Sequence, residues 1–423
     1  MTGIDQSFRR TLWLIFSILS AVSMWYYVEN VWSVGQPAHF SDLYARWWGA
    51  HELLLHRRDP YSPAVTREIQ IVIYGAPVES LRPGDAAELA GGFAYPIYIV
   101  FLLWPTVHWP FSVVRDLFFC LFVALTLLSL FLWLYWLRWR PPAAKLCMLA
   151  VFTFGSFPVL QGLKLQNLSL LVAFLLAATM ALLAAEHSAT AGLLLAGATI
   201  KPQFVILLIP SLALWTMGDW GGRRRLAWSF VAATSVLMLG GEAIAPGWFS
   251  RFLSVARAYR RYTYGHSLLD VWFSPRVGLV FAAVLVLVVL AVCWKLRSYP
   301  ARSSGLFLVS SWVLAATLVV IPTLEPHAQL LLLPSFLFLL REGSRIWRSG
   351  KIARLLLTAA WLLLGWAWAA SFGMMVAGIW LPAVTLRRLW DLPLYTSPLI
   401  PFGIFVILGF LLAQESEHPS LAV

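Results

Sequence analysis

Long apolar stretches recur along almost the whole chain and limit how it can fold. Of its 423 residues, 60% are hydrophobic and 12% are charged, and this charged fraction is about half that of an ordinary soluble domain. An α-helix needs about 20 mainly apolar residues to cross the hydrocarbon core of a bilayer. The pattern predicts an all-α, polytopic membrane protein that forms a single transmembrane domain over residues 1–423.

The apolar runs predict a bundle of about twelve transmembrane helices. We place them at residues 11–28, 112–137, 146–160, 168–185, 189–200, 203–216, 226–243, 277–294, 304–321, 327–341, 352–375 and 396–413. Several runs are short, and prolines such as Pro202 and Pro322 interrupt apolar stretches. Broken helices at membrane depth survive only inside protein or beside a wet cavity. The breaks therefore indicate a cavity, and residues 96–109 suit a short interfacial helix.

The distribution of basic residues predicts how the bundle is oriented. Strongly basic short connections occur at residues 138–145, 223–225, 295–302 and 341–354. Short loops rich in Lys and Arg are typically cytoplasmic, and Arg9 and Arg10 place the N-terminus on the same side. We expect a multi-pass protein of the cell membrane with both termini cytoplasmic. Because basic loops account for the net charge of +12, the lipid bilayer is an expected partner and nucleic acid is not.

Two connections are then predicted to lie on the outer face. Residues 30–95 form a long, nearly neutral loop in which we expect short interfacial helices, and residues 244–276 form a second outer loop. Within the first loop, Asp42 and Arg46 are four residues apart and would share one helix face. They form either a weak surface ion pair or a carboxylate placed to act as a general base.

Further polar residues are candidates for binding a substrate. Lys201 interrupts an apolar stretch, so it either faces a functional cavity or extends to the interface. His327, beside Glu325, starts an outer helix and is either structural or a donor to phosphate. Arg260 and Arg261 belong to a basic, aromatic segment. That segment either lies on anionic lipid head groups or clamps a phosphate.

Two other polar residues, and some absences, complete the pattern. Gln166 either caps a helix or faces the site, and Tyr95 precedes Pro96 at a predicted helix start. The sequence has no GxxxxGK[ST], GxGxxG, HExxH or GxSxG motif, which argues against ATPases, nucleotide-cofactor enzymes, zinc proteases and serine hydrolases. No cofactor is expected. No dense carboxylate cluster points to a metal site, although a divalent metal stays open.

Several short segments occur in an order that resembles a known family. They are Phe40-Ser41-Asp42-Leu43-Tyr44, Asp59-Pro60-Tyr61, Phe93-Ala94-Tyr95-Pro96, Leu165-Gln166-Asn167 and Thr199-Ile200-Lys201-Pro202-Gln203. Over residues 10–340 the chain resembles glycosyltransferase family 87, the polyprenyl-phosphate-mannose-type transferases of the GT-C superfamily. It departs from the family pattern at Leu165, where a glycine is usual, and at Ile97, where a second proline is common.

The resemblance implies a GT-C-like fold and an inverting hexosyltransferase. A hexose, mannose by family default, would pass from a polyprenyl-phosphate donor to a hydroxyl of a glycolipid or glycan acceptor on the extracytoplasmic face. Asp42 would match the family's general base, and Lys201 and His327 would face the donor phosphate. The alternative is a transporter or flippase for a lipid-linked or anionic substrate, because broken helices and a lysine at membrane depth suit it as well.

Overall fold

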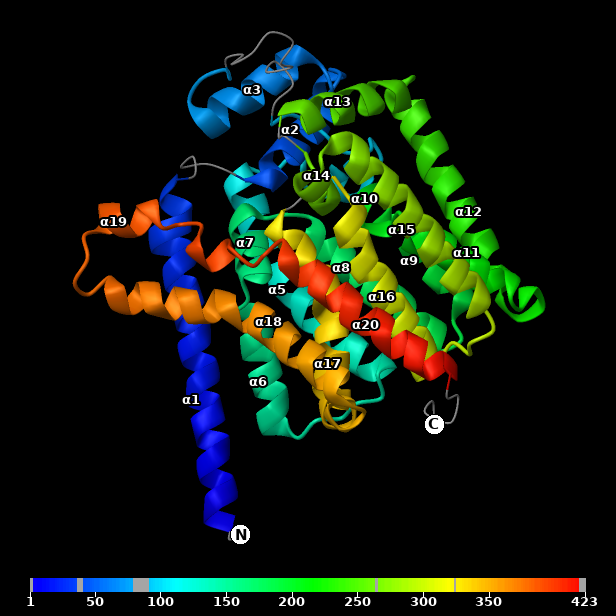
Figure 1. The fold of residues 1–423 in the computed structure, drawn as a ribbon. Coiled ribbons are helices and arrows are strands. Elements are labelled where there is room, and N and C mark those ends of the chain that lie inside the picture. The colour runs from blue at the N-terminus through cyan, green and yellow to red at the C-terminus, as the bar shows by residue number, and fades with distance from the viewer. Residues whose placement is uncertain (1–2, 36–40, 79–90, 263–264, 323–324, 418–423) are drawn as a thin grey trace.

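The computed structural model describes residues 3–35, 41–78, 91–262, 265–322 and 325–417, and every regular element in these ranges is a helix (Figure 1). The first half contains α1 (Gly3–Tyr27), the π-helical η1 (Val28–Trp32), η2 (Ser33–Gly35), α2 (Asp42–His56), α3 (Pro63–Tyr74), α4 (Ile99–Leu103), η4 (Trp104–Thr106), α5 (Phe111–Trp136), α6 (Ala143–Phe154), α7 (Phe157–Leu165), α8 (Ser169–Ala184), α9 (Ser188–Ala198) and α10 (Pro202–Val205). The second half contains α11 (Leu208–Met217), α12 (Trp220–Ile244), α13 (Trp248–Tyr262), α14 (Leu268–Phe273), α15 (Pro275–Lys295), α16 (Ser304–Val320), η5 (Pro326–Leu332), α17 (Leu333–Arg348), α18 (Lys351–Ala377), α19 (Ala383–Arg388), η6 (Leu392–Leu394) and α20 (Leu399–Glu417).

Six helical segments among the described residues are long and apolar enough to cross a membrane. They are Thr11–Trp32, Phe111–Trp136, Trp220–Ile244, Pro275–Lys295, Lys351–Ala377 and Ala383–Glu415. The pair α6 and α7, bent by 55° at its break, would make a seventh. The structure supports a polytopic helical membrane protein but does not confirm twelve spans.

The difference arises from short apolar helices. Ser169–Ala184, Ser188–Ala198, Pro202–Met217 and Ser304–Val320 each have 10 to 17 residues. At 1.5 Å per residue, even 17 residues reach only about 25 Å, less than the 30 Å of an average hydrocarbon core. Most residues of α8 and α16 are buried in the protein, and a helix that is apolar all round belongs in such a core.

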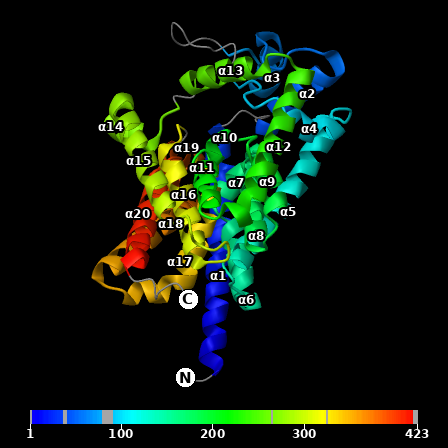
Figure 2. The same cartoon turned by 90° about the vertical axis from the view of Figure 1, so that its right-hand side faces the viewer.

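The helices separate into a bundle and an end cap. In both views α2, α3 and α13 lie together at one end of the molecule, and the N-terminal end of α1 lies at the other (Figures 1 and 2). Within the end cap, α2 and α3 belong to residues 30–95, for which we predicted short interfacial helices, and α13 belongs to the predicted second outer loop, residues 244–276. The end cap therefore contains the start of α2, where Asp42 lies.

Local sequence explains how α2 is positioned. Ser41 is its N-cap, and its side chain accepts a hydrogen bond from the backbone N–H of Tyr44 at 3.3 Å. Farther along, Gly49 lets the segment before α4 approach closely. A Cβ at this position would lie 2.3 Å from the ring of Phe93. The contact places Tyr95, two residues later, beside the first half of α2.

The packing of α9 against α12 depends on a glycine. A Cβ at Gly192 would lie 2.0 Å from Ser229 Oγ and 2.6 Å from the Leu226 carbonyl oxygen. We expect Gly192→Ala to destabilise the protein by about 1–3 kcal/mol, because the helices must separate. Gly197→Ala on the same helix is the matched control, since its Cβ would lie 3.6 Å from Leu175. Thermal unfolding in detergent measures both. Equal melting temperatures for the two variants would contradict the packing argument.

Candidate active site

Asp42 is tied to the bundle through Asn167, which lies between α7 and α8. The Asn167 side-chain amide donates a short hydrogen bond to Asp42 Oδ2. On the other side, Arg46 Nη1 lies 3.9 Å from Asp42 Oδ1. The Asp42 side chain is 18% exposed, so its carboxylate is held but still accessible. The predicted ion pair on one face of α2 is present, with an amide partner added from the bundle.

Lys201 lies at the N-cap of α10 and is only 3% exposed. Its Nζ donates to Asn167 Oδ1 and to Ser169 Oγ, each at 2.7 Å. A buried ammonium is costly unless it is paired and hydrogen-bonded, and these two acceptors meet that need. Lys201 therefore does not extend to the interface. Its side chain is directed to the start of α8, where Asn167 connects it to Asp42.

Aromatic rings border the charged groups. The Arg46 guanidinium lies 4.5 Å from the ring centroid of buried Tyr95. Lys201 Nζ lies 5.9 Å from the same ring and 5.0 Å from that of Phe204. Tyr95 thus contacts both cations, and cations over ring faces are attracted to them. The structure brings this predicted residue into the cluster.

Glu325 and His327 form the opposite part of the cluster. His327 Nε2 lies 2.8 Å from Glu325 Oε2, and the His327 backbone N–H donates to Gln161 Oε1 at 2.9 Å. Burial alone would raise the pKa of Glu325. The attraction of His327, Lys201 and Arg46 outweighs it and lowers that pKa from 4.5 to about 2. Glu325 is therefore ionised at neutral pH and electrostatically coupled to both cations.

The His327 ring retains hydrogen-bonding capacity. The residue is 3% exposed. Its Nε2 is paired with Glu325, but its Nδ1 has no hydrogen-bond partner among the described residues. Leaving a buried polar group unsatisfied costs about 1–3 kcal/mol. A ligand oxygen placed against the ring would remove that cost, which makes His327 a candidate binding residue.

The other predicted binding residues lie elsewhere or outside the described part. Buried Gln166 is the C-cap of α7, with φ of 52°. Its Oε1 accepts from Ser41 Oγ, and its Nε2 donates to the Arg115 carbonyl oxygen, both at 2.8 Å. Gln166 therefore fastens the cap of α2. The backbones of Arg260 and Arg261 belong to α13, but their side chains lie outside the described residues, so that prediction stays open.

Three cluster members were not assigned to the site from sequence. Asn167 was named only within the Leu165-Gln166-Asn167 segment, Arg46 only as an ion-pair partner, and Ser169 was not considered. The sequence did contain a reason to consider Asn167 and Ser169, because a buried lysine requires hydrogen-bond acceptors. They are polar residues at the beginning of the apolar run that forms α8.

An apolar groove lies along the bundle. Its larger part, about 1000 Å³, is bordered by side chains of α1, α6, α17 and α18, from Trp13 and Lys145 to Trp361. A smaller part shares Phe152 and Trp368 with it and is lined in part by Gln329. Gln329 follows His327 by two residues in the chain.

A helical bundle with several apolar helices long enough to cross a membrane defines a polytopic membrane protein. The model of glycosyltransferase family 87 matches residues 93–322, more than half of the chain, and the chain belongs to this family. It is a membrane glycosyltransferase. No curated protein and no solved structure matches it. The matched region contains Tyr95, Gln166 and Lys201, whereas Asp42, Glu325 and His327 lie outside it.

The charge of Glu325 predicts a pH dependence of stability. Because its pKa in the folded protein is lowered to about 2 from 4.5, its contribution is fully present above pH 4.5 and is lost as the pH falls towards 2. We expect Glu325→Gln to lose less stability than the parent protein over this interval. Chemical unfolding in micelles at a series of pH values measures the difference.

A second variant tests the cause. His327→Asn removes the main group that lowers the pKa of Glu325, so the loss of stability should move to higher pH. Parallel stability curves for the parent protein and both variants would show that Glu325 does not carry this pH dependence.

Proposed function

We propose that the protein transfers a hexose, with mannose as the first candidate, from a polyprenyl-phosphate donor to a hydroxyl of a glycolipid or glycan acceptor. Transfer inverts the anomeric carbon and takes place on the extracytoplasmic face of the cell membrane. The observation that carries the proposal is Asn167, which joins the Asp42 carboxylate to the buried Lys201 ammonium. One cluster thereby offers a base and a cationic site for phosphate.

Asp42 is the general base in this proposal. Its carboxylate takes the proton of the acceptor hydroxyl, and the acceptor oxygen attacks the anomeric carbon from the face opposite the phosphate. The new C–O bond forms as the bond between that carbon and the phosphate oxygen breaks. Polyprenyl phosphate leaves with the electron pair. Asn167 and Arg46 orient the carboxylate from opposite sides.

Lys201 and His327 stabilise the leaving phosphate. Negative charge grows on the phosphate during bond breaking, and preorganised cationic and hydrogen-bonding groups lower the energy of such a transition state. Lys201 uses two of its three N–H donors on Asn167 and Ser169. Glu325 orients the buried His327 ring from 2.8 Å through Nε2, and Nδ1 has no partner among the described residues.

The apolar groove favours a lipid-linked donor. An isoprenoid tail is apolar and long, and a groove of about 1000 Å³ between membrane helices suits it. Because Gln329 lines the groove and follows His327 by two residues, a tail bound there would bring its phosphate towards His327. A water-soluble nucleotide sugar would make no use of this surface.

The base is tested with Asp42→Asn. We expect transfer by this variant to fall about 10²- to 10⁴-fold, the usual contribution of a general base, with the KM for the donor close to that of the parent protein. The assay follows the mass of the glycosylated acceptor after incubation with polyprenyl-phosphate mannose in detergent. Asp116→Asn is the matched control, since that carboxylate is 74% exposed. Undiminished transfer by Asp42→Asn would remove Asp42 as the base.

A transporter or flippase remains the second candidate, because the groove and the broken α6–α7 pair would also accept a moving lipid. Reconstituted vesicles separate the two functions. We expect purified protein to consume donor and release glycosylated product, without moving a fluorescent polyprenyl phosphate between leaflets faster than empty vesicles do. Lipid movement without sugar transfer, across a panel of hexose donors, would favour the flippase.

A further inference from the structure

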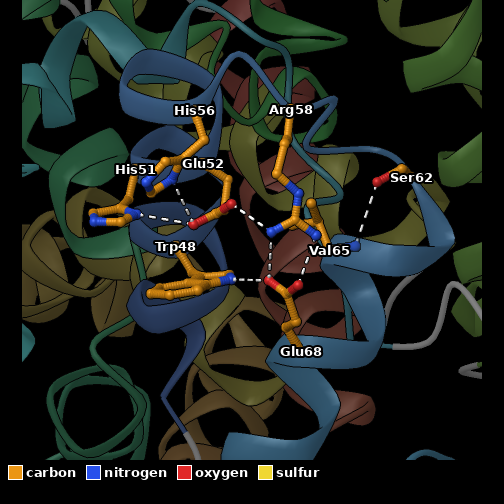
Figure 3. Close-up of polar contacts among 8 residues, drawn as sticks. All are labelled: Trp48, His51, Glu52, His56, Arg58, Ser62, Val65 and Glu68. Carbon is orange, nitrogen blue, oxygen red and sulfur yellow. Dashed lines mark hydrogen bonds and ion pairs between the residues drawn. The ribbon is translucent and has the colours of Figure 1, made fainter.

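A second polar cluster lies in the last turns of α2, away from the transfer site. His51 Nδ1 and His56 Nδ1 each lie 3.1 Å from the same carboxylate oxygen, Glu52 Oε1 (Figure 3). His51 follows Asp42 by nine residues on the same helix, which is about 13 Å along the axis. The proposed transfer uses none of these three side chains.

The carboxylate in this cluster is buried and held in place. Glu52 is 2% exposed. Its other oxygen, Oε2, accepts a hydrogen bond from Arg58 Nη1 at 2.6 Å, and Arg58 Nη2 donates to Glu68 Oε1 of α3 at 2.6 Å. Arg58 thus fixes the plane of the Glu52 carboxylate, and Oε1 is presented to the two imidazoles (Figure 3). The His51 ring is itself stacked on Trp48, with centroids 4.9 Å apart.

We propose that His51, Glu52 and His56 bind a divalent transition-metal ion, with Zn²⁺ the best match. Three ligand atoms, one from each residue, all lie within 4.8 Å of one another, and each Nδ1 lies 3.1 Å from Glu52 Oε1. Tetrahedral zinc with bonds of about 2.0–2.1 Å places its ligands about 3.3 Å apart, close to the observed 3.1 Å separations. Two imidazoles and one carboxylate favour zinc over Mg²⁺ or Ca²⁺, which prefer oxygen ligands.

The surroundings of the cluster fit such a site. The side chain of His56 is 54% exposed, so an ion can reach it from solvent and a water molecule can complete its coordination. A hydrogen bond to the second oxygen of a ligating carboxylate is a common orienting contact around metals, and Arg58 supplies it. Binding through Nδ1 leaves the proton of each imidazole on Nε2.

The ion would act on structure, since it lies far from Asp42. It would tie together the last turns of α2 and, through Glu52 and Arg58, join them to Glu68 on α3. An ion that binds only the folded protein stabilises it in proportion to the logarithm of its concentration. The site would therefore make the end cap, and with it the helix that holds Asp42, more stable when zinc is present.

The experiment uses the full chain, purified without a histidine tag and stripped with chelator. Zinc is titrated by calorimetry, and retained metal is counted by mass spectrometry after dialysis. We expect one zinc ion per chain, a higher melting temperature with zinc, and no competition from Mg²⁺. In the His51→Ala/His56→Ala double variant, zinc affinity should fall at least about 100-fold, because the loss of even an outer partner costs 10- to 100-fold.

Two further variants keep the result interpretable. His108→Ala, which removes an exposed histidine outside the cluster, should bind zinc like the parent protein. His56→Ala alone truncates a largely exposed ring, so it should fold normally and still lose the site. Retention of one zinc ion per chain in both His56→Ala and the double variant would overturn the proposal. So would a parent protein that retains no zinc, in which case the imidazoles only hydrogen-bond to Glu52.

Discussion

The structure of the site depends on the buried ammonium of Lys201. An unpaired charge at this depth would cost several kcal/mol, so the chain must bring acceptors to it. Asn167 and Ser169 do this from the start of α8, which fixes that helix against the turn between α9 and α10. The same Asn167 side chain then holds Asp42 of α2. The need to pair the buried Lys201 ammonium thereby brings the first residues of α2, α8 and α10 together.

The end cap is attached to the bundle at the first turn of α2, and within the end cap α2 is joined to α3 at its last turns. At the first turn of α2, Ser41 donates to Gln166 and Asp42 accepts from Asn167. Two consecutive residues between α7 and α8 therefore hold two consecutive residues at the start of α2. At the last turns, Glu52 is joined to α3 through Arg58. The first attachment orients the proposed base, and the second makes α2 and α3 one unit.

Sequence patterns predicted much of this arrangement, and physical reasons explain what they missed. The predicted apolar runs coincide with helical segments, although the runs 146–160, 203–216 and 327–341 each cover two of them. Hydropathy cannot distinguish a lipid-facing helix from one buried in protein, because lipid tails are as apolar as leucine. For that reason the structure does not confirm separate spans at α8, α9 and α16. Asp42, Lys201 and the Glu325–His327 pair do lie in one cluster. The Gln166 side chain contacts Ser41, the N-cap of α2. Its direction follows from the left-handed backbone at Gln166, which the sequence pattern does not reveal.

Asn167 links the two proposed halves of the chemistry, and its orientation is fixed by charge. A carboxylate can only accept hydrogen bonds and an ammonium can only donate them, so the amide nitrogen must face Asp42 and the amide oxygen must face Lys201. The reversed amide would place oxygen against carboxylate and N–H groups against ammonium. An aspartate at this position would repel Asp42, and a leucine would leave both charges without this partner. The proposed base and the proposed phosphate-binding cation are therefore coupled through one side chain that neither acid nor hydrocarbon can replace.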